Sequence, residues 1–142
     1  MSYLLDTDHL SILQRPGGTE YASVVANLNL RAGGDANVSV VSFHEQMLGC
    51  NDRISQARTA ADLVRGYALL EQIITTFTQF TVLPFDDAAA TRFLSLKATR
   101  LRVSTMDLRI AVTALSRGMT VVTRNVRDFG KVPGLRTEDW TK

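Results

Sequence analysis

Short apolar segments alternate along this chain with longer segments of helical periodicity, and this alternation is the strongest constraint on its fold. We expect strands at residues 3–5, 38–41, 81–83 and 119–123, and a short edge strand at 134–137. Apolar and β-branched runs bounded by turn residues favour buried strands. Strands that alternate with helices build βαβ units, so the sequence predicts an α/β fold with a mainly parallel central sheet and helices on both faces.

The segments between these strands are expected to be helical, at residues 8–14, 19–31, 43–49, about 54–77, 86–100 and 105–117. Gly33 and Gly34 are expected to end the second of them. In the longest, apolar residues recur at spacings of three and four, at Ile54, Ala57, Ala61, Val64 and Ala68. Such a stripe favours packing inside the monomer, with a partner helix as the alternative.

Length and composition restrict the class of protein. The 142 residues fit one domain, residues 1–142, and a content of 45% hydrophobic and 21% charged residues excludes a disordered chain. Acidic residues follow the first three apolar ones, which is unlike a signal peptide, and no apolar run approaches the roughly 20 residues of a membrane span. Cys50 is the only cysteine, and we expect it to be inert. A lone thiol favours a cytoplasmic protein with no membrane partner.

The basic residues are concentrated in one part of the chain. Residues 92–131 carry nine Arg and Lys against two acids, a balance of +7, while the rest of the chain carries −5. Thirteen of the sixteen basic residues are Arg, whose planar guanidinium suits phosphate oxygens. This distribution favours a polyanionic partner, and ordinary solvated helix faces are the alternative.

Acidic residues follow the expected strands. Asp6 ends the first strand, and each of Glu45, Asp107 and Asp128 stands three residues after a Ser or Asn that could cap a helix. Those Ser and Asn residues are Ser42, Ser104 and Asn125. Each pattern resembles a capping box, so each acid could serve only to stabilise a helix. In parallel sheets, however, ligands bind at the carboxyl ends of the strands, where these acids are expected to meet.

The position of Asp107 favours a metal site over a simple cap. Ile110, Ala111 and Ala114 lie three, four and seven residues after it, which places its carboxylate on the apolar face of the helix. A buried carboxylate is costly unless it is paired or binds a metal. Oxygen ligands without Cys or His at zinc spacing suit Mg²⁺ or Mn²⁺. The chemistry indicated is metal-assisted attack of water on a phosphodiester.

These residues resemble the PIN-domain ribonucleases, and within them the VapC toxins of toxin-antitoxin modules. Four segments carry the resemblance across essentially the whole chain: residues 4–8 (LLDTD), 41–45 (VSFHE), 107–111 (DLRIA), and 121–129 (VVTRNVRDF) with 132–135 (VPGL). Each motif is weak alone, but their order and spacing are specific. The resemblance implies a three-layer α/β/α fold with a protruding helical hairpin.

The resemblance also implies a function and a set of site residues. Asp6, Glu45, Asp107 and Asp128 would be the catalytic metal ligands for Mg²⁺ or Mn²⁺. Side chains of Thr123 and Asn125 would support them; Asn125 or a water could replace Asp128 as a ligand. The protein would be an endoribonuclease toxin that forms a homodimer. A cognate VapB-type antitoxin would inhibit it and would provide the only contact with operator DNA.

Several further residues have two interpretations. Arg109, Arg124 and Arg127 stand near the expected ligands and could contact RNA phosphates, or they could be ordinary surface residues. Asp8 is expected to be the N-cap of the first helix, with a supporting role in the site as the alternative.

His9 and His44 are expected to be polar surface or supporting groups instead of a general base, because no nucleophile adjoins them. Trp140 is expected to anchor the C-terminal segment.

Two other functions compete with a nuclease. Asp6-Thr7-Asp8 resembles the D-x-D motif of haloacid-dehalogenase-type phosphatases, in which the first Asp is a nucleophile. In that family a lysine precedes the second acidic pair, whereas here Lys97 follows Asp86 and Asp87. The second alternative is a non-catalytic PIN-like module that binds RNA or protein, with structural acids. Loss of metal-dependent cleavage on replacing Asp6 or Asp107 by Asn would separate these hypotheses.

Overall fold

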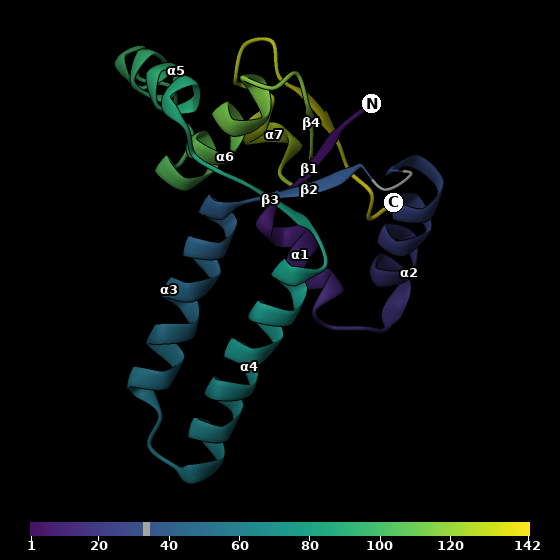
Figure 1. Ribbon diagram of the computed structural model, residues 1–142, viewed down its shortest axis with the longest axis vertical. Helices are drawn as coiled ribbons and strands as arrows, with labels where there is room; N and C mark the ends of the chain where they lie inside the picture. Colours follow the sequence, from purple (N-terminus) through teal and green to yellow (C-terminus); the bar gives the residue numbers. More distant parts are fainter. Residues whose placement is uncertain (33–34) are drawn as a thin grey trace.

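A parallel sheet in the strand order β3-β2-β1-β4-β5 forms the centre of the computed structural model, which describes residues 1–32 and 35–142 (Figure 1). The strands are β1 (Tyr3–Leu5), β2 (Ala36–Ser39), β3 (Thr81–Leu83), β4 (Thr120–Val122) and β5 (Arg136–Glu138). Leu5 is in register with Val38 of β2 and Val122 of β4. The carboxyl ends of these three strands therefore lie side by side at one edge of the sheet.

Side chains of the central strands alternate between two cores, as expected for strands covered on both faces. Leu4 and Val121 point into one core, and Leu5 and Val122 into the other. The helices of the first core are α5 (Asp87–Ala98), α6 (Thr105–Leu115) and α7 (Val126–Phe129). The helices of the second are α1 (Thr7–Leu13), α2 (Gly18–Asn27), α3 (Val40–Gln56) and α4 (Ala60–Thr78), although Val41 of α3 packs in the first core. The α/β/α class with a parallel sheet is confirmed.

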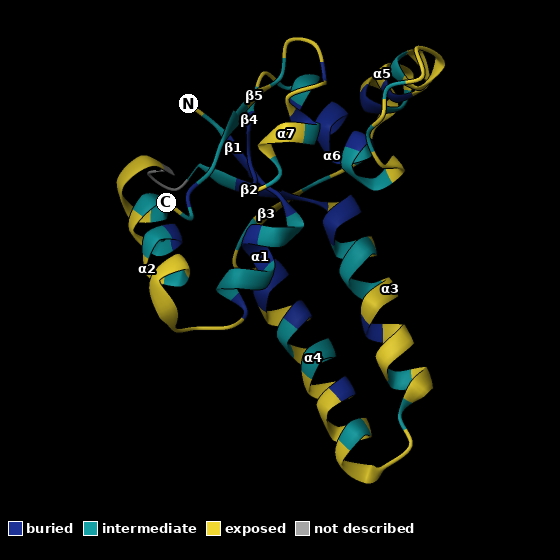
Figure 2. Ribbon diagram, turned by 180° about the vertical axis from the view of Figure 1, so that it is seen from behind, coloured by how far each residue is buried: buried dark blue, intermediate teal, exposed yellow. Residues whose placement is uncertain are grey.

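Helices α3 and α4 form a hairpin that projects away from the sheet (Figure 1), and much of its far end is exposed (Figure 2). The two helices pack closely where a glycine allows it. A Cβ atom added at Gly66 would lie 2.8 Å from Cγ1 of Ile54, and Cys50 Sγ lies 3.5 Å from the Gly66 carbonyl oxygen. The hairpin implied by the resemblance is confirmed, and Cys50 is buried inside it.

The predicted helix at 54–77 is wrong, because the chain breaks inside it. The helix expected at 43–49 continues as α3 to Gln56, and α4 begins after Thr59, whose hydroxyl accepts a hydrogen bond from the Asp62 N–H at 3.1 Å. The apolar stripe is consequently divided between two helices. Ile54 packs against the core, whereas Val64 is 69% exposed.

The predicted strand at 38–41 is misplaced by two residues. β2 is Ala36–Ser39, and Val40 and Val41 already belong to α3. The Ser39 hydroxyl accepts a hydrogen bond from the Val41 N–H at 3.0 Å, which ends the strand and caps the helix. The edge strand likewise lies later than the predicted 134–137, as β5, where it pairs with β4 in parallel.

The predicted helices did not include α7, and the remaining elements agree with the predictions to within a few residues. Helix α2 continues into a π-helical turn, Leu28–Ala32, and the predicted stop at Gly33 and Gly34 lies outside the described residues. Trp140 is buried and its ring packs edge-on against Tyr3 with centroids 5.0 Å apart, which confirms that it anchors the C-terminal segment. Within the described ranges, every helix is too short or too polar to cross a membrane.

Candidate active site

Asp6 is the most buried of the predicted metal ligands. It directly follows β1 and is only 5% exposed. Its Oδ1 accepts a hydrogen bond from the Thr7 N–H at 2.7 Å, and its Oδ2 accepts one from the Thr123 hydroxyl at 2.8 Å. Burial, reinforced by the nearby carboxylates of Asp8 and Asp107, raises the pKa of Asp6 to about 7. A positive charge placed beside this carboxyl group would favour its ionised form.

Asp8 supports the site and is not the N-cap of α1, so that prediction is wrong. Asp6 occupies the cap position, since its side chain bonds the first N–H of the helix. Asp8 Oδ2 instead accepts a hydrogen bond from the Arg124 N–H at 2.9 Å and lies 3.3 Å from the Thr123 hydroxyl, whose proton is donated to Asp6. The Asp8 carboxylate therefore joins the exit of β1 to the exit of β4.

His9 extends this connection to the C-terminal segment. The ring is fully buried, so it is a supporting group and not a surface residue, whereas His44 is exposed. Nε2 of His9 accepts a hydrogen bond from the Trp140 N–H at 3.2 Å. A backbone N–H can only donate, so the ring proton of the neutral imidazole lies on Nδ1 and is donated to Asp8 at 2.7 Å.

Glu45 lies in the second turn of α3 and is not part of a capping box. Ser39 is the N-cap, so Ser42 is already inside the helix and that predicted pattern is wrong. The Thr7 hydroxyl donates to Glu45 Oε1 at 2.5 Å and lies 3.1 Å from the buried Ser42 Oγ. Thr7 therefore connects the β1 exit, where Asp6 lies, to the acid on α3.

Asp107 and Asp128 are connected through Asn125. The Asn125 amide donates to Asp107 Oδ2 at 3.4 Å and to Asp128 Oδ2 at 3.2 Å. Asn125 makes no side-chain cap, so that predicted capping pattern is wrong, whereas Ser104 does cap α6 by accepting from the Asp107 N–H at 3.2 Å.

The two acids held by Asn125 differ in their electrostatic surroundings. Burial raises the pKa of Asp107, and the nearby Glu45 and Asp128 carboxylates add to this effect. The hydrogen bond from Asn125, together with the Lys131 ammonium 3.1 Å away, lowers the pKa of Asp128.

The four predicted ligands are neighbours, but they do not form a closed cage. Asp107 is near enough to raise the pKa of Asp6, and Glu45 and Asp128 are near enough to raise that of Asp107. In residues 1–32 and 35–142, no three Asp, Glu, His or Cys side chains are close enough together to hold a metal ion directly.

This donor set still fits a hard divalent cation. All four groups supply oxygen, and two of them have raised pKa values that an added positive charge would lower. Mg²⁺ usually keeps several of its waters and needs few direct carboxylates.

The three predicted phosphate-binding arginines lie in different surroundings. The Arg109 guanidinium packs over the Phe93 ring at 5.3 Å. Arg124 is half-exposed and paired with Glu20 at 3.1 Å, and Arg127 is exposed. Their contacts with RNA remain predictions.

Sequence reasoning gave no role to two residues that contact the predicted ligands, namely Thr7 and Lys131. Thr7 directly follows Asp6, and Lys131 stands one helical turn after Asp128. This spacing was the only signal for them, and it is too common to identify a site.

The chain matches the family model described as "PIN domain" over residues 3–135. It is 33% identical over 147 residues to the tRNA(fMet)-specific endonuclease VapC of Shigella flexneri, with 99% of both chains covered. It is 32% identical over 107 residues to the protein of the same name from Salmonella typhimurium, with 72% of this chain and 74% of that protein covered.

A solved structure gives the same result. A chain of the DNA-bound VapBC crystal structure from Salmonella typhimurium superposes with a TM-score of 0.72 at 27% identity, covering 99% of this chain and 98% of that one. The chain that folds into this sheet, with its projecting hairpin and its acids at one edge, thus aligns over nearly its full length with a relative named VapC. This chain belongs to the PIN domain family, together with relatives that carry the name VapC.

Proposed function

We propose that this protein is a metal-dependent endoribonuclease that acts as the toxin of a VapBC-type toxin-antitoxin module. The names of its relatives, an endonuclease specific for tRNA(fMet) and ribonucleases called VapC, support hydrolysis of RNA. The observation that carries the proposal is the group of four linked acids, Asp6, Glu45, Asp107 and Asp128, at the carboxyl edge of the parallel sheet. This edge is where α/β folds bind ligands.

In this proposal the four carboxylates would hold Mg²⁺ or Mn²⁺, some of them through waters that the ion keeps. The bound ion would lower the pKa of a coordinated water and stabilise the negative charge that develops on the phosphate. The chain keeps the ligands oriented before the ion arrives. The Thr7 N–H and the Thr123 hydroxyl fix Asp6. The Thr7 hydroxyl fixes Glu45.

The remaining two ligands and the substrate are held by other side chains. The Asn125 amide fixes Asp107 and Asp128. Near neutral pH Asp6 retains a proton for part of the time, because its pKa is about 7. A bound cation would favour the loss of this proton. Arg124 and Arg127 would attract the RNA backbone, which is a polyanion.

The partners follow the same proposal. A VapB-type antitoxin would inhibit the enzyme and would make the contact with operator DNA, as suggested by the VapBC complex solved on DNA. We also propose that the protein forms a homodimer. The buried thiol of Cys50 suits a reducing compartment, in accord with action in the cytoplasm.

The test is cleavage of a mixed pool of structured and unstructured RNAs by purified protein free of antitoxin. Reactions contain Mg²⁺, Mn²⁺ or EDTA, and the variants are Asp6→Asn and Asp107→Asn, with Asp87→Asn on the exposed start of α5 as the matched control. We expect discrete cleavage that needs the metal and both acids and that the control retains.

Two results would contradict the proposal. RNA binding without cleavage in every reaction favours the non-catalytic module. Release of phosphate from a monoester such as p-nitrophenyl phosphate, without RNA cleavage, favours the phosphatase.

A further inference from the structure

A pocket of about 620 Å³ lies beside the acidic site, between α1, α2 and the turn that follows β4. Asp8 forms part of its wall and contacts Thr123 of the acidic site, so the two are directly adjacent. Its volume lies within the range of small-ligand pockets. The side chains that matter for its chemistry are those of Ser11, Arg15, Thr19, Glu20, Tyr21 and Arg124.

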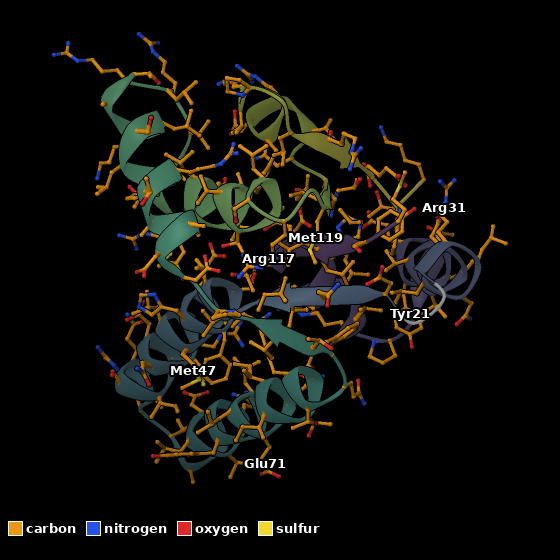
Figure 3. All side chains as sticks on the ribbon, turned by 45° about the horizontal axis from the view of Figure 1, so that its top comes forward. Tyr21, Arg31, Met47, Glu71, Arg117 and Met119 are labelled. Atoms are coloured by element: carbon orange, nitrogen blue, oxygen red, sulfur yellow. The ribbon has the colours of Figure 1, made fainter. Side chains whose placement is uncertain are left out.

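The lining combines two guanidinium groups with an aromatic ring, and the carboxylates of Asp8 and Glu20 balance their charge. Arg15 and Arg124 each provide a guanidinium, and Tyr21 provides the ring. Val24 and Leu28 lie three and seven residues after Tyr21, on the same side of the helix, and both pack in the core. Tyr21 is not part of that core and lines the pocket instead. In Figure 3 Tyr21 lies on α2, well apart from Met47 and Glu71 of the α3–α4 hairpin.

Arg124 is restrained by a weak ion pair. Its guanidinium lies 3.1 Å from the Glu20 carboxylate, and both side chains are about half exposed. Exposed ion pairs of this kind contribute little free energy, because water and salt screen them. An entering phosphate could therefore take the place of Glu20 on the same guanidinium. In this arrangement Glu20 competes with the phosphate and weakens its binding.

We propose that this pocket binds one nucleotide of single-stranded RNA that flanks the cleaved bond, with the base against Tyr21 and its phosphate between Arg15 and Arg124. The inference depends on the proposed RNA-cleaving function. Aromatic rings bind unpaired bases by stacking, and guanidinium groups bind the phosphates between them. An acidic peptide would use the two arginines but would gain little from the ring.

Binding, measured apart from cleavage, tests this inference. The protein is the Asp107→Asn variant in EDTA, and the probe is a fluorescent single-stranded RNA of mixed sequence. Tyr21→Ala is expected to weaken binding about fivefold to a hundredfold, as typical for the loss of one stacked base. Tyr67→Ala, at an exposed tyrosine on α4, is the matched control and should leave binding unchanged.

The charged residues give a second, independent measurement. Arg15→Gln and Arg124→Gln are each expected to weaken binding and to reduce the slope of log affinity against log salt by about one. Glu20→Gln should strengthen binding about twofold to fivefold, on the order of one exposed ion pair. Asp62→Asn, which removes the partner of Arg65 in another exposed ion pair, is its control.

The outcomes separate the inference from the proposed function. If wild type cleaves RNA but Tyr21→Ala binds as tightly as its parent, the pocket assignment is wrong and the nuclease proposal stands. If only the arginine variants lose affinity, the pocket binds simple anions or acidic peptides, which also overturns the assignment. If the Asp107→Asn parent does not bind RNA and wild type does not cleave it, both proposals are wrong.

Discussion

Replacing Asp6 by Asn should stabilise the metal-free protein at neutral and alkaline pH, although it removes a proposed ligand. Asn has almost the same shape, and its Oδ1 can still accept from the Thr7 N–H. Its Nδ2 can donate to the Thr123 hydroxyl, which then donates to Asp8, 3.3 Å away. The variant therefore keeps the hydrogen bonds of this carboxyl group and loses only its charge.

The magnitude follows from the pKa of Asp6. Burial raises it from 3.8 to about 7. Between these values the native state binds a proton that the unfolded chain has lost, so stability falls as pH rises from about 4 to 7, and the whole cost is present above pH 7. A difference of about 3 pKa units corresponds to about 4 kcal/mol. Because neighbouring acids share this effect, we expect Asp6→Asn to be more stable than wild type by about 2–4 kcal/mol at pH 8 and nearly equal at pH 4.

Urea unfolding in EDTA, followed by circular dichroism at several pH values between 4 and 8, measures this difference. Asp87→Asn, at an exposed acid, is the control and should show no such trend. Millimolar Mg²⁺ should then stabilise wild type more than Asp6→Asn, because only wild type keeps the charge that the ion compensates. The reasoning would be refuted if Asp6→Asn were less stable than wild type at pH 8. It would also be refuted if the difference in free energy of unfolding between the two proteins were the same at every pH.

Three further predictions concern groups around the site and in the hairpin. Thr7→Val should lower kcat about tenfold or more, because the Glu45 carboxylate loses the hydrogen bond that orients it; single-turnover RNA cleavage measures this, and unchanged kcat would contradict it. His9→Phe should cost about 1–3 kcal/mol in urea unfolding, because it leaves a buried backbone N–H without an acceptor; equal stability would show that this bond is unimportant. Gly66→Ala should destabilise by about 1–3 kcal/mol through overlap with Ile54, whereas Gly49→Ala, with open space around its Cβ, should stabilise by up to about 1 kcal/mol; the same sign for both would exclude the packing argument.

Local patterns predicted the elements well where one physical signal dominated. Tyr3–Leu5 is a buried strand because three apolar residues are followed at once by an acid that caps the next helix. Val40 and Val41 misled the prediction, since β-branched residues favour strands, while the Ser39 hydroxyl starts a helix there. The hairpin turn was missed because the apolar spacing continues through it without Gly or Pro. Thr59, with Asp62 three residues later, is a capping signal that periodicity outweighed.

The acids of the site could be chosen from the sequence, but their connections could not. Asp6 and Asp107 stood out because each combines charge with an apolar setting, and both are found with raised pKa values. The role of Asp8 depends on Arg124, more than a hundred residues away along the chain. The residues around Asp8 alone therefore predicted that it caps the helix. The same holds for His9, which contacts the backbone of Trp140.

The strand order explains how these distant residues meet. Leu5 of β1 is in register with Val122 of β4, so the residues that follow them, Asp6 and Thr123, emerge side by side. This register brings the two positions together whatever the sequence between them, and here they carry a hydroxyl and a carboxylate. The same pairing brings Arg124 next to Asp8, and both residues line the neighbouring pocket. The pairing of β1 with β4 therefore has two effects. It holds Asp6, the most buried acid of the site, and it brings the Arg124 guanidinium to the pocket where we place the flanking nucleotide.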